Sequence, residues 1–297
     1  MRRTYVLEVK GRSLTVGLRT WIMGILNVTP DSFSDGGEYP DKEKAVERGL
    51  EMIEEGADVV DIGGESTRPG ARPVSEDEEM ERILPVVRGL RKSAPVLISV
   101  DTMKAAVAEA ALEAGADIIN DVSAFRFDPR MAGVISGRGA AVVLMHMKGT
   151  PETMQSDPRY ADLFDEIRWF LKDRIEEARS AGIGRGRIIV DPGIGFGKSP
   201  EDNLALIDNL GFLEELGCPV LAGASRKSFI GKALGLPVTE RLEGSIAAGV
   251  LAIARGAHIL RVHDVRAMRR AADMADAILG GNPGNAADRE KKEEHAG

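Results

Sequence analysis

Residues 55–62 read "EGADVVDI", and close variants return as "AGADIIND" (114–121), "RGAAVVLM" (138–145) and "RGAHILRV" (255–262). In each variant a helical pattern ends, a glycine follows, and a short β-rich apolar run begins. Glycine at such a position is typical of a left-handed helix C-cap, after which the chain turns into a parallel strand. The phrase therefore predicts recurring helix-to-strand joints of an α/β protein.

The same unit of strand, loop and amphipathic helix occurs eight times along the chain. The predicted strands cover 20–28, 58–64, 95–101, 117–121, 140–147, 187–193, 219–225 and 258–264. The predicted helices cover 41–55, 76–92, 103–114, 129–137, 160–181, 201–216, 240–255 and 266–279. Eight alternating units favour a closed (β/α)8 TIM barrel over an open doubly wound sheet. We expect one barrel domain over 19–280, an N-terminal extension or hairpin across the barrel bottom over 1–18, and a disordered tail over 281–297.

The composition, 43% hydrophobic and 29% charged, is that of an ordinary globular protein. The longest apolar stretch, 245–254, is about half of a membrane span. The N-terminus lacks the apolar segment of a secretory signal, so we expect a cytoplasmic protein. The single cysteine, Cys218, cannot form an internal disulfide, and no His/Cys cluster has zinc-site spacing. A net charge of −8 argues against a nucleic-acid-binding surface.

Polar residues gather at the C-terminal ends of the predicted strands, which is where TIM barrels carry their sites. These residues are Asn27, Asp61, Asp101, Asn120, Asp121, His146, Asp191, Ser225, Arg226, Lys227, Arg261, His263 and Asp264. For a single aspartate, a helix cap or a loop hydrogen bond is the alternative role, and it fits Asp121 and Asp264 best. Asp101 or the adjacent Thr102 could cap the next helix. For His146 the sequence favours neither a role in the site nor a structural hydrogen bond. We assign no function to His258 or His295.

Arg261 and His263 belong to one apolar strand and, by alternation, point toward the same side of the sheet. A buried arginine without a partner is costly. Either an internal carboxylate or a negative group from outside must meet this pair. A lone carboxylate would satisfy one of them but hardly both.

Two loops are too long and too particular in composition for simple connections: "NVTPDSFSDGGEY" (27–39) and "GGESTRPGARPV" (63–74). They predict mobile lids over a substrate, with plain surface excursions as the alternative. A third stretch, "DPGIGFGK" (191–198), resembles a phosphate cradle only loosely. It lacks the P-loop spacing, so nucleotide binding is not supported.

Seven motifs together resemble the dihydropteroate synthases, folate-pathway enzymes of the pterin-binding barrel family. The motifs are "GILNVTPDSFSDGG", "DVVDIGGESTRPGA", "ISVDT", "IINDVSA", "DPGIGFGK", "SRKSFIG" and "LRVHDV". They occur in family order over about residues 20–265, and seven in register are highly specific. The resemblance implies that 6-hydroxymethyl-7,8-dihydropterin diphosphate is joined to p-aminobenzoate, giving 7,8-dihydropteroate and diphosphate through a pterin-methylene cation.

The resemblance also implies roles for individual residues. Asp191 would accept from the amino-pyrimidinone edge of the pterin, because an ionised carboxylate can take adjacent N–H donors side by side. Asp101 and Asn120 would complete the pterin pocket, with Met145 as an apolar wall and Lys227 donating to the pterin carbonyl side. Asp101 would also stabilise the cation electrostatically.

For the diphosphate, the resemblance implies Arg261 and His263 together with Arg68, and Asn27 acting through Mg²⁺, which bridges phosphates with few protein contacts. The p-aminobenzoate ring would pack against Phe33, Thr67, Pro69 and Phe196. Its carboxylate would lie by Ser225, at the N-terminus of the following helix. Asp35 would contact the metal or the amine. Catalysis would thus rest on Asp101, Lys227, Arg261 and Asp35.

Three alternatives remain at this level. A corrinoid-linked methyltetrahydrofolate methyltransferase would share the pterin pocket but leave Arg261, His263 and "STRPG" without a role. A Schiff-base aldolase could use Lys227. A degenerate barrel could bind pterin without turnover. The resemblance further implies a homodimer that acts on small molecules, without nucleic acid or membrane, and that is a sulfonamide target.

Overall fold

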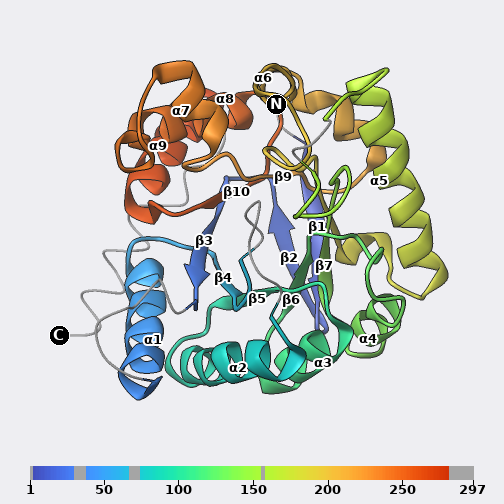
Figure 1. Ribbon diagram of the computed structural model, residues 1–297, viewed down its shortest axis with the longest axis vertical. Helices are drawn as coiled ribbons and strands as arrows, with labels where there is room; N and C mark the ends of the chain where they lie inside the picture. The colour runs from blue at the N-terminus through green and yellow to red at the C-terminus, as the bar shows by residue number, and fades with distance from the viewer. Residues whose placement is uncertain (1–2, 30–37, 67–73, 155–157, 281–297) are drawn as a thin grey trace.

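The computed structural model describes residues 3–29, 38–66, 74–154 and 158–280. Eight parallel strands form one sheet in the order β8-β7-β6-β5-β4-β3-β10-β9 (Figure 1). Their bounds are β3 (Trp21–Asn27), β4 (Val59–Gly63), β5 (Leu97–Asp101), β6 (Ile118–Asp121), β7 (Ala141–Met145), β8 (Ile188–Asp191), β9 (Leu221–Ala222) and β10 (Ile259–Val262). A parallel bridge between Val190 and Val220 joins β8 to the chain just before β9. The predicted (β/α)8 barrel is confirmed.

Helices surround the strands on the outside (Figure 1). They are α1 (Glu38–Glu54), α2 (Glu76–Ser93), α3 (Ala105–Ala114), α4 (Met131–Gly137), α5 (Leu163–Ser180), α6 (Pro200–Asp208), α7 (Ser228–Leu234), α8 (Leu242–Ala254) and α9 (Val265–Ile278), with 3-10 turns η2 (Arg185–Arg187), η3 (Leu210–Leu216) and η4 (Val238–Glu240). None of the helices in this part of the chain has the length and apolarity needed to cross a membrane.

Two helix predictions are wrong in detail. The helix expected over 201–216 breaks at Asn209, whose ψ of 24° is not helical, and the chain continues as the 3-10 turn η3. The short helix α7 was not predicted. It has only seven residues and follows the polar end of β9 directly, so it offers too little periodicity to be recognised.

The repeated joints adopt the predicted geometry. Gly56 and Gly115 have φ of 104° and 119°, and an added Cβ would lie 2.8 Å and 2.9 Å from arginine side-chain carbons. In two of the phrases the fourth residue is an aspartate that accepts a hydrogen bond from the neighbouring strand. Asp58 accepts from Ile22 N at 2.8 Å, and Asp117 accepts from Ile98 N at 3.0 Å.

His258 occupies the equivalent place in the last phrase, and its Nδ1 lies 3.1 Å from Val220 N. Its Nε2 lies 3.0 Å from Arg3 O. Both ring nitrogens are therefore engaged at the N-terminal end of the barrel, which agrees with the absence of an assigned function for this histidine.

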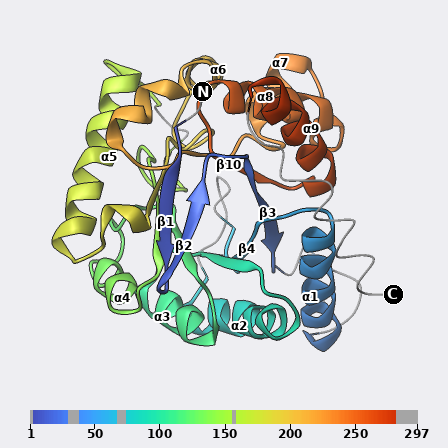
Figure 2. The same cartoon turned by 180° about the vertical axis from the view of Figure 1, so that it is seen from behind.

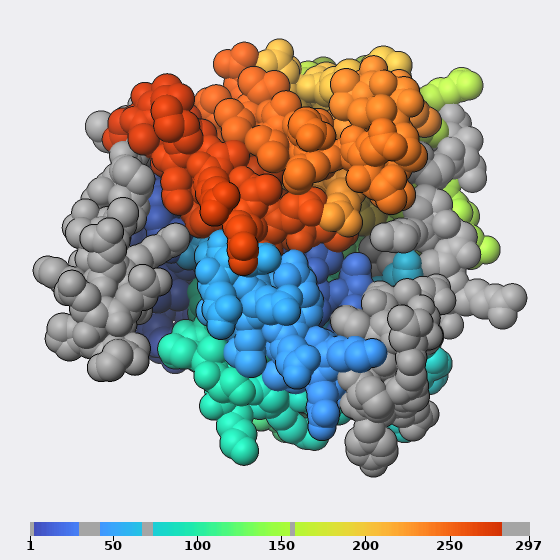
Figure 3. All heavy atoms as spheres, turned by 90° about the vertical axis from the view of Figure 1, so that its left-hand side faces the viewer, coloured from blue at the N-terminus to red at the C-terminus, as the bar shows by residue number. Residues whose placement is uncertain are grey.

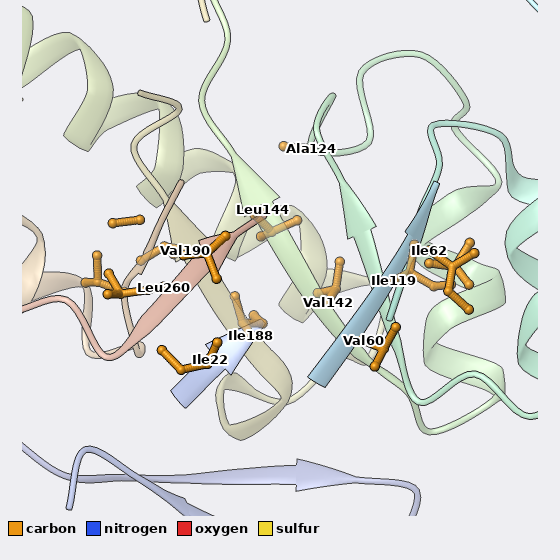
Figure 4. Packing of buried hydrophobic residues seen from close by; sticks show 14 of the residues in the cluster. Ile22, Val60, Ile62, Ile119, Ala124, Val142, Leu144, Ile188, Val190 and Leu260 are labelled. Carbon is orange, nitrogen blue, oxygen red and sulfur yellow. The ribbon is translucent and has the colours of Figure 1, made fainter. Parts of the chain in front are cut away.

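Strand alternation divides the buried side chains into two sets. Outward residues such as Ile22, Val60, Ile119 and Val142 pack in the layer between strands and helices (Figure 4). Inward residues of the N-terminal strand halves form a separate apolar cluster inside the barrel. It includes Trp21, Met23, Val59, Leu97, Ile118, Ala141, Val143, Ile189, Leu221 and Ile259. The lower half of the barrel interior is therefore filled with apolar side chains.

An antiparallel hairpin, β1 (Tyr5–Val9) and β2 (Arg12–Val16), lies across the N-terminal end of the barrel (Figure 2). Leu7, Val9 and Val16 belong to the interior apolar cluster, so the hairpin covers it from below. Arg12 pairs with Asp117 at 2.6 Å and ties the hairpin to a joint of the barrel.

Leu7→Ala should lower the free energy of unfolding by about 2–5 kcal/mol, because it leaves a cavity under the fully buried interior cluster. Val6→Ala in the same strand is the control. Val6 is 57% exposed, so its truncation should cost less than about 0.5 kcal/mol. Chemical denaturation measures both, and equal losses would show that the hairpin does not close the barrel core.

Candidate active site

Above the apolar half, the inward positions of the same strands become polar. The sequences Val59-Val60-Asp61, Leu97-Ile98-Ser99-Val100-Asp101 and Ile118-Ile119-Asn120 each run from an apolar inward residue to a polar one. Because parallel strands end at the same rim, these side chains converge. The charged cluster so formed lies at the C-terminal face, where the sequence predicted the site.

Arg261 is the centre of this cluster. Its Nε lies 2.6 Å from Asp61 Oδ2 and its Nη2 lies 2.8 Å from Asp101 Oδ2. Two internal carboxylates on neighbouring strands therefore meet this arginine, which is more than the single carboxylate considered from the sequence. Among the described residues, Nη1 makes no hydrogen bond and stays available for a ligand.

Asp101 carries the most perturbed carboxylate of the cluster. Burial raises its pKa to about 7, and the nearby Asp61 adds to this while Arg261 opposes it. Its Oδ1 is buried and has no hydrogen-bond partner in the described part of the chain. Asp101 therefore changes charge near neutral pH and has an acceptor atom left over for a ligand.

A second charged pair lies across the barrel. Asp191 accepts from Gly193 N at 2.6 Å, and burial raises its pKa. Burial lowers the pKa of Lys227 to about 8, against the opposing charge of Asp191. Lys227 Nζ donates to Ile194 O and lies 4.5 Å from the centre of the Phe196 ring. Phe196 in turn packs against the buried cluster that contains Met145.

Ser225 and His263 form a third contact. Ser225 Oγ lies 3.1 Å from His263 Nδ1 and accepts from His263 N at 3.2 Å. Ser225 precedes α7, which begins at Ser228 with Lys227 as its N-cap, so the serine stands three residues before the helix rather than in its first turn.

Other polar strand ends serve their own loops. Asp121 accepts from Ser123 N at 2.8 Å and Phe125 N at 2.7 Å, and Asp264 pairs with Arg226. These are the loop roles anticipated for the two aspartates. The capping role considered for Asp101 is wrong. The first amide of α3, Ala105 N, donates instead to Asp128 Oδ2 at 3.0 Å.

The sequence analysis did not predict a role for Lys198. This lysine is the hydrogen-bond partner of His146. Its Nζ lies 3.0 Å from His146 Nδ1 and donates to Phe196 O at 3.0 Å. Burial lowers the pKa of Lys198 to about 7 and that of His146 to about 2. The pair thus fixes the loop between β8 and α6, which carries Ile194 and Phe196. The sequence feature that could have indicated a structural role for Lys198 is its position directly before Ser199-Pro200, which begins a helix.

The metal position predicted at Asn27 lies at the end of β3, half-buried. Gly63 lies beside it, because a Cβ added there would be 3.7 Å from both Asn27 Oδ1 and Asp101 Cβ, an ordinary van der Waals distance. No group of three His, Cys, Asp or Glu residues in the described segments could hold a metal. Five predicted site residues lie outside the described residues: Phe33, Asp35, Thr67, Arg68 and Pro69.

The sequence profile of the family described as pterin binding enzyme matches residues 23–263, so the chain belongs to the pterin-binding enzymes. Its relatives within that class are dihydropteroate synthases. The enzyme of Synechocystis sp. is 48% identical over 263 residues, which are 88% of this chain and 91% of that protein. The enzyme of Bacillus subtilis is 48% identical over 277 residues, 93% of this chain and 95% of that protein.

Solved structures agree with this assignment. Xanthomonas albilineans dihydropteroate synthase with 4-aminobenzoic acid superposes with a TM-score of 0.86 at 48% identity, covering 93% of this chain and 99% of that one. The same enzyme in complex with 7,8-dihydropteroate gives a TM-score of 0.82 at 45% identity, covering 92% and 98%. The chain is a member of the dihydropteroate synthase family.

Lys198→Met should remove a pH dependence of stability. The folded-state pKa of Lys198 lies near 7 and its unfolded value near 10.5, so the folded protein binds fewer protons than the unfolded chain between these values. This group therefore makes the free energy of unfolding rise with pH over that window. Denaturant unfolding at several pH values measures the difference between wild type and variant.

That difference should change steadily between pH 7 and about 10, in favour of the wild type. Lys172→Met, at an exposed lysine of α5, is the control and should show no such trend. A constant difference for Lys198→Met would contradict the neutral, buried state of this amine.

Proposed function

We propose that this protein condenses 6-hydroxymethyl-7,8-dihydropterin diphosphate with p-aminobenzoate, forming 7,8-dihydropteroate and diphosphate in folate biosynthesis. The observation that carries the proposal is the cluster of charged residues at the barrel's C-terminal face, in a chain of the dihydropteroate synthase family. It consists of the buried Asp61, Asp101 and Asp191 and the partly buried Lys227 and Arg261. The Xanthomonas albilineans structures with 4-aminobenzoic acid and with 7,8-dihydropteroate support this substrate and this product.

Asp191 binds the pterin in this proposal. One of its carboxylate oxygens takes Gly193 N, which holds the group in place and leaves its other oxygen to accept from the amino-pyrimidinone edge. Asn120 completes the hydrogen bonds from the far side of the pocket. Met145 covers the ring as an apolar wall, and Lys227 donates to the pterin carbonyl side from beside Asp191.

Arg261 binds the diphosphate in this proposal, with His263 from the same strand and Arg68 from the second lid. Asn27 would hold Mg²⁺ through its amide oxygen, which lies near Gly63 and Asp101. One protein oxygen suits an ion that takes its remaining ligands from phosphate and water. When bound, Mg²⁺ supplies positive charge that makes diphosphate a better leaving group.

Asp101 stabilises the reacting carbon. The C–O bond to diphosphate breaks with its electron pair, the exocyclic methylene carbon becomes positive, and the amine of p-aminobenzoate then forms the C–N bond and releases a proton. An ionised carboxylate near that carbon stabilises the transition state more than the neutral substrate. No protein nucleophile is required.

The p-aminobenzoate ring packs against Phe196, together with Phe33, Thr67 and Pro69 of the two lids, and its carboxylate lies by Ser225. Asp35 would contact the metal or the amine. Sulfonamides mimic p-aminobenzoate, and the structure of Yersinia pestis dihydropteroate synthase with a sulfonamide drug supports the proposal that this protein is a sulfonamide target.

We further propose a homodimer located in the cytoplasm. The helix α8, "LEGSIAAGVLAIA", is apolar on all sides, yet its Leu251 is 54% exposed. The adjacent α9 lies on the side that faces the viewer in Figure 3, and its Met274 and Ile278 are also largely exposed. A helix that is apolar all round is normally covered, and exposed apolar patches mark association surfaces. This supports a second copy as the partner.

Mixing the purified protein with the dihydropterin diphosphate, p-aminobenzoate and Mg²⁺ tests the reaction. We expect diphosphate and dihydropteroate in equal amounts, and no turnover in Asp191→Ala, which should lose pterin binding. Diphosphate release that does not change when p-aminobenzoate is omitted would contradict condensation. Tight pterin binding without turnover would favour a methyltransferase or a silent binder, and a borohydride-trapped adduct on Lys227 would favour an aldolase.

Arg261→Ala should weaken the binding of inorganic diphosphate, measured by calorimetry with Mg²⁺, by about tenfold or more, because it removes charge-assisted hydrogen bonds. It also leaves Asp61 and Asp101 without their cation, which repels the anion further. Arg226→Ala, at a half-exposed arginine paired with Asp264, is the control and should bind like the wild type. Equal affinities of wild type and Arg261→Ala would refute the assigned role.

A further inference from the structure

Asp61 stands in the middle of β4, below the ligand-facing residues, and its side chain is fully buried. A single oxygen of this carboxylate, Oδ2, accepts from two neighbours. Arg261 Nε lies 2.6 Å away and Asn120 Nδ2 lies 3.1 Å away. Asp61 therefore contacts one residue proposed for the diphosphate and one proposed for the pterin.

We propose that Asp61 is a positioning residue that holds Asn120 and Arg261 in the orientations that bind the two ends of the pterin substrate. This inference rests on the proposed function and deepens it. Asp61 itself touches neither substrate, so it acts through the two side chains above it.

The contact decides which end of the Asn120 amide faces the pterin pocket. An amide has a donor end and an acceptor end of nearly the same size. Because the carboxylate of Asp61 can only accept, it takes the Nδ2 end of Asn120. The amide oxygen is then presented on the opposite side, where it can accept from a ring N–H of the pterin. Without Asp61 the amide could rotate and offer a donor instead.

The contact also fixes the plane of the Arg261 guanidinium. Nε is held by Asp61 on β4 and Nη2 by Asp101 on β5, so the group is anchored at two corners by two strands. Nη1, which has no hydrogen bond among the described residues, is left at the remaining corner. Orientation fixed before binding lowers the entropy lost when an anion arrives.

The cost of keeping Asp61 argues against a role in packing alone. Its Oδ1 is buried and has no hydrogen-bond partner in the described residues. Such an oxygen is destabilising, and more so when it is charged. An apolar residue, as in the layer just below, would avoid this cost but would leave Arg261 Nε and Asn120 Nδ2 without their acceptor. A carboxylate retained here is better explained by what it orients.

Asp61→Asn tests the proposal, because it keeps the volume and removes the charge and the acceptor-only character. We expect it to weaken, by about tenfold or more each, the binding of 6-hydroxymethylpterin and of inorganic diphosphate with Mg²⁺. The control is Ser99→Ala. Ser99 is the neighbour of Asp61 in the β4–β5 register and is equally buried, but it has no hydrogen bond to Arg261 or Asn120. It should change either affinity by less than about threefold.

Double variants separate positioning from a general structural defect. In an Arg261→Ala background, Asp61→Asn should cost no further diphosphate affinity but should still weaken pterin binding. In an Asn120→Ala background the pattern should reverse. Such non-additivity is expected only when two residues act through each other. Additive losses in both backgrounds would overturn the proposal.

If Asp61→Asn does not fold, as judged by circular dichroism and thermal unfolding, Asp61→Ser replaces it in the same measurements, since a neutral hydroxyl can keep one of the two contacts. Failure of this inference and of the proposed function are distinguishable. A wild type that binds neither ligand refutes the function. A wild type that binds both, with a folded Asp61 variant of equal affinity, refutes only the role of Asp61.

Discussion

The placement of one buried guanidinium is the constraint on which the rest of the site depends. Arg261 lies inside a barrel whose lower half is apolar, so its charge must be balanced by carboxylates that other strands of the barrel bring to it. Asp61 and Asp101 do this from β4 and β5. Burial brings the pKa of Asp101 to about 7; Arg261 opposes this shift and Asp61 adds to it. The arrangement that keeps the arginine in place thereby also prepares the carboxylate proposed for the chemistry.

The N-terminal half of the barrel stabilises the fold, and the C-terminal face carries the candidate site. The hairpin and the inward apolar residues close the N-terminal half, and the paired Asp58 and Asp117 at the repeated joints complete the hydrogen bonds of neighbouring strands there. The strands can then end in buried charges at the other rim. Buried polar groups also stabilise a loop at this face. The amine of Lys198 contacts His146 and donates to Phe196 O. The same loop contacts Lys227, which donates to Ile194 O.

Much of this was predictable from the sequence, and the exceptions have physical reasons. The recurring Gly-Ala joints and apolar runs predicted the eight strands and their closure into a barrel. β10 ends at Val262, so the shared face expected for Arg261 and His263 stays a prediction. The partners of Arg261 were not predictable, because they depend on the register between β10, β4 and β5, which no local pattern encodes. The short helix α7 has only seven residues and therefore offers too little periodicity to be recognised. Lys198 was missed because a lysine after a glycine-rich run usually indicates a solvated loop.

A crystal structure of the protein with 6-hydroxymethylpterin, diphosphate and Mg²⁺ would test most directly whether recognition depends on a pre-oriented Arg261. We predict that Arg261 Nε remains within about 3.2 Å of Asp61 Oδ2, the usual limit for such a hydrogen bond, while the guanidinium contacts diphosphate and Asn120 turns its oxygen toward the pterin. A structure in which Arg261 leaves Asp61 to reach the diphosphate, or in which Asn120 offers its nitrogen to the pterin, would contradict the pre-oriented site.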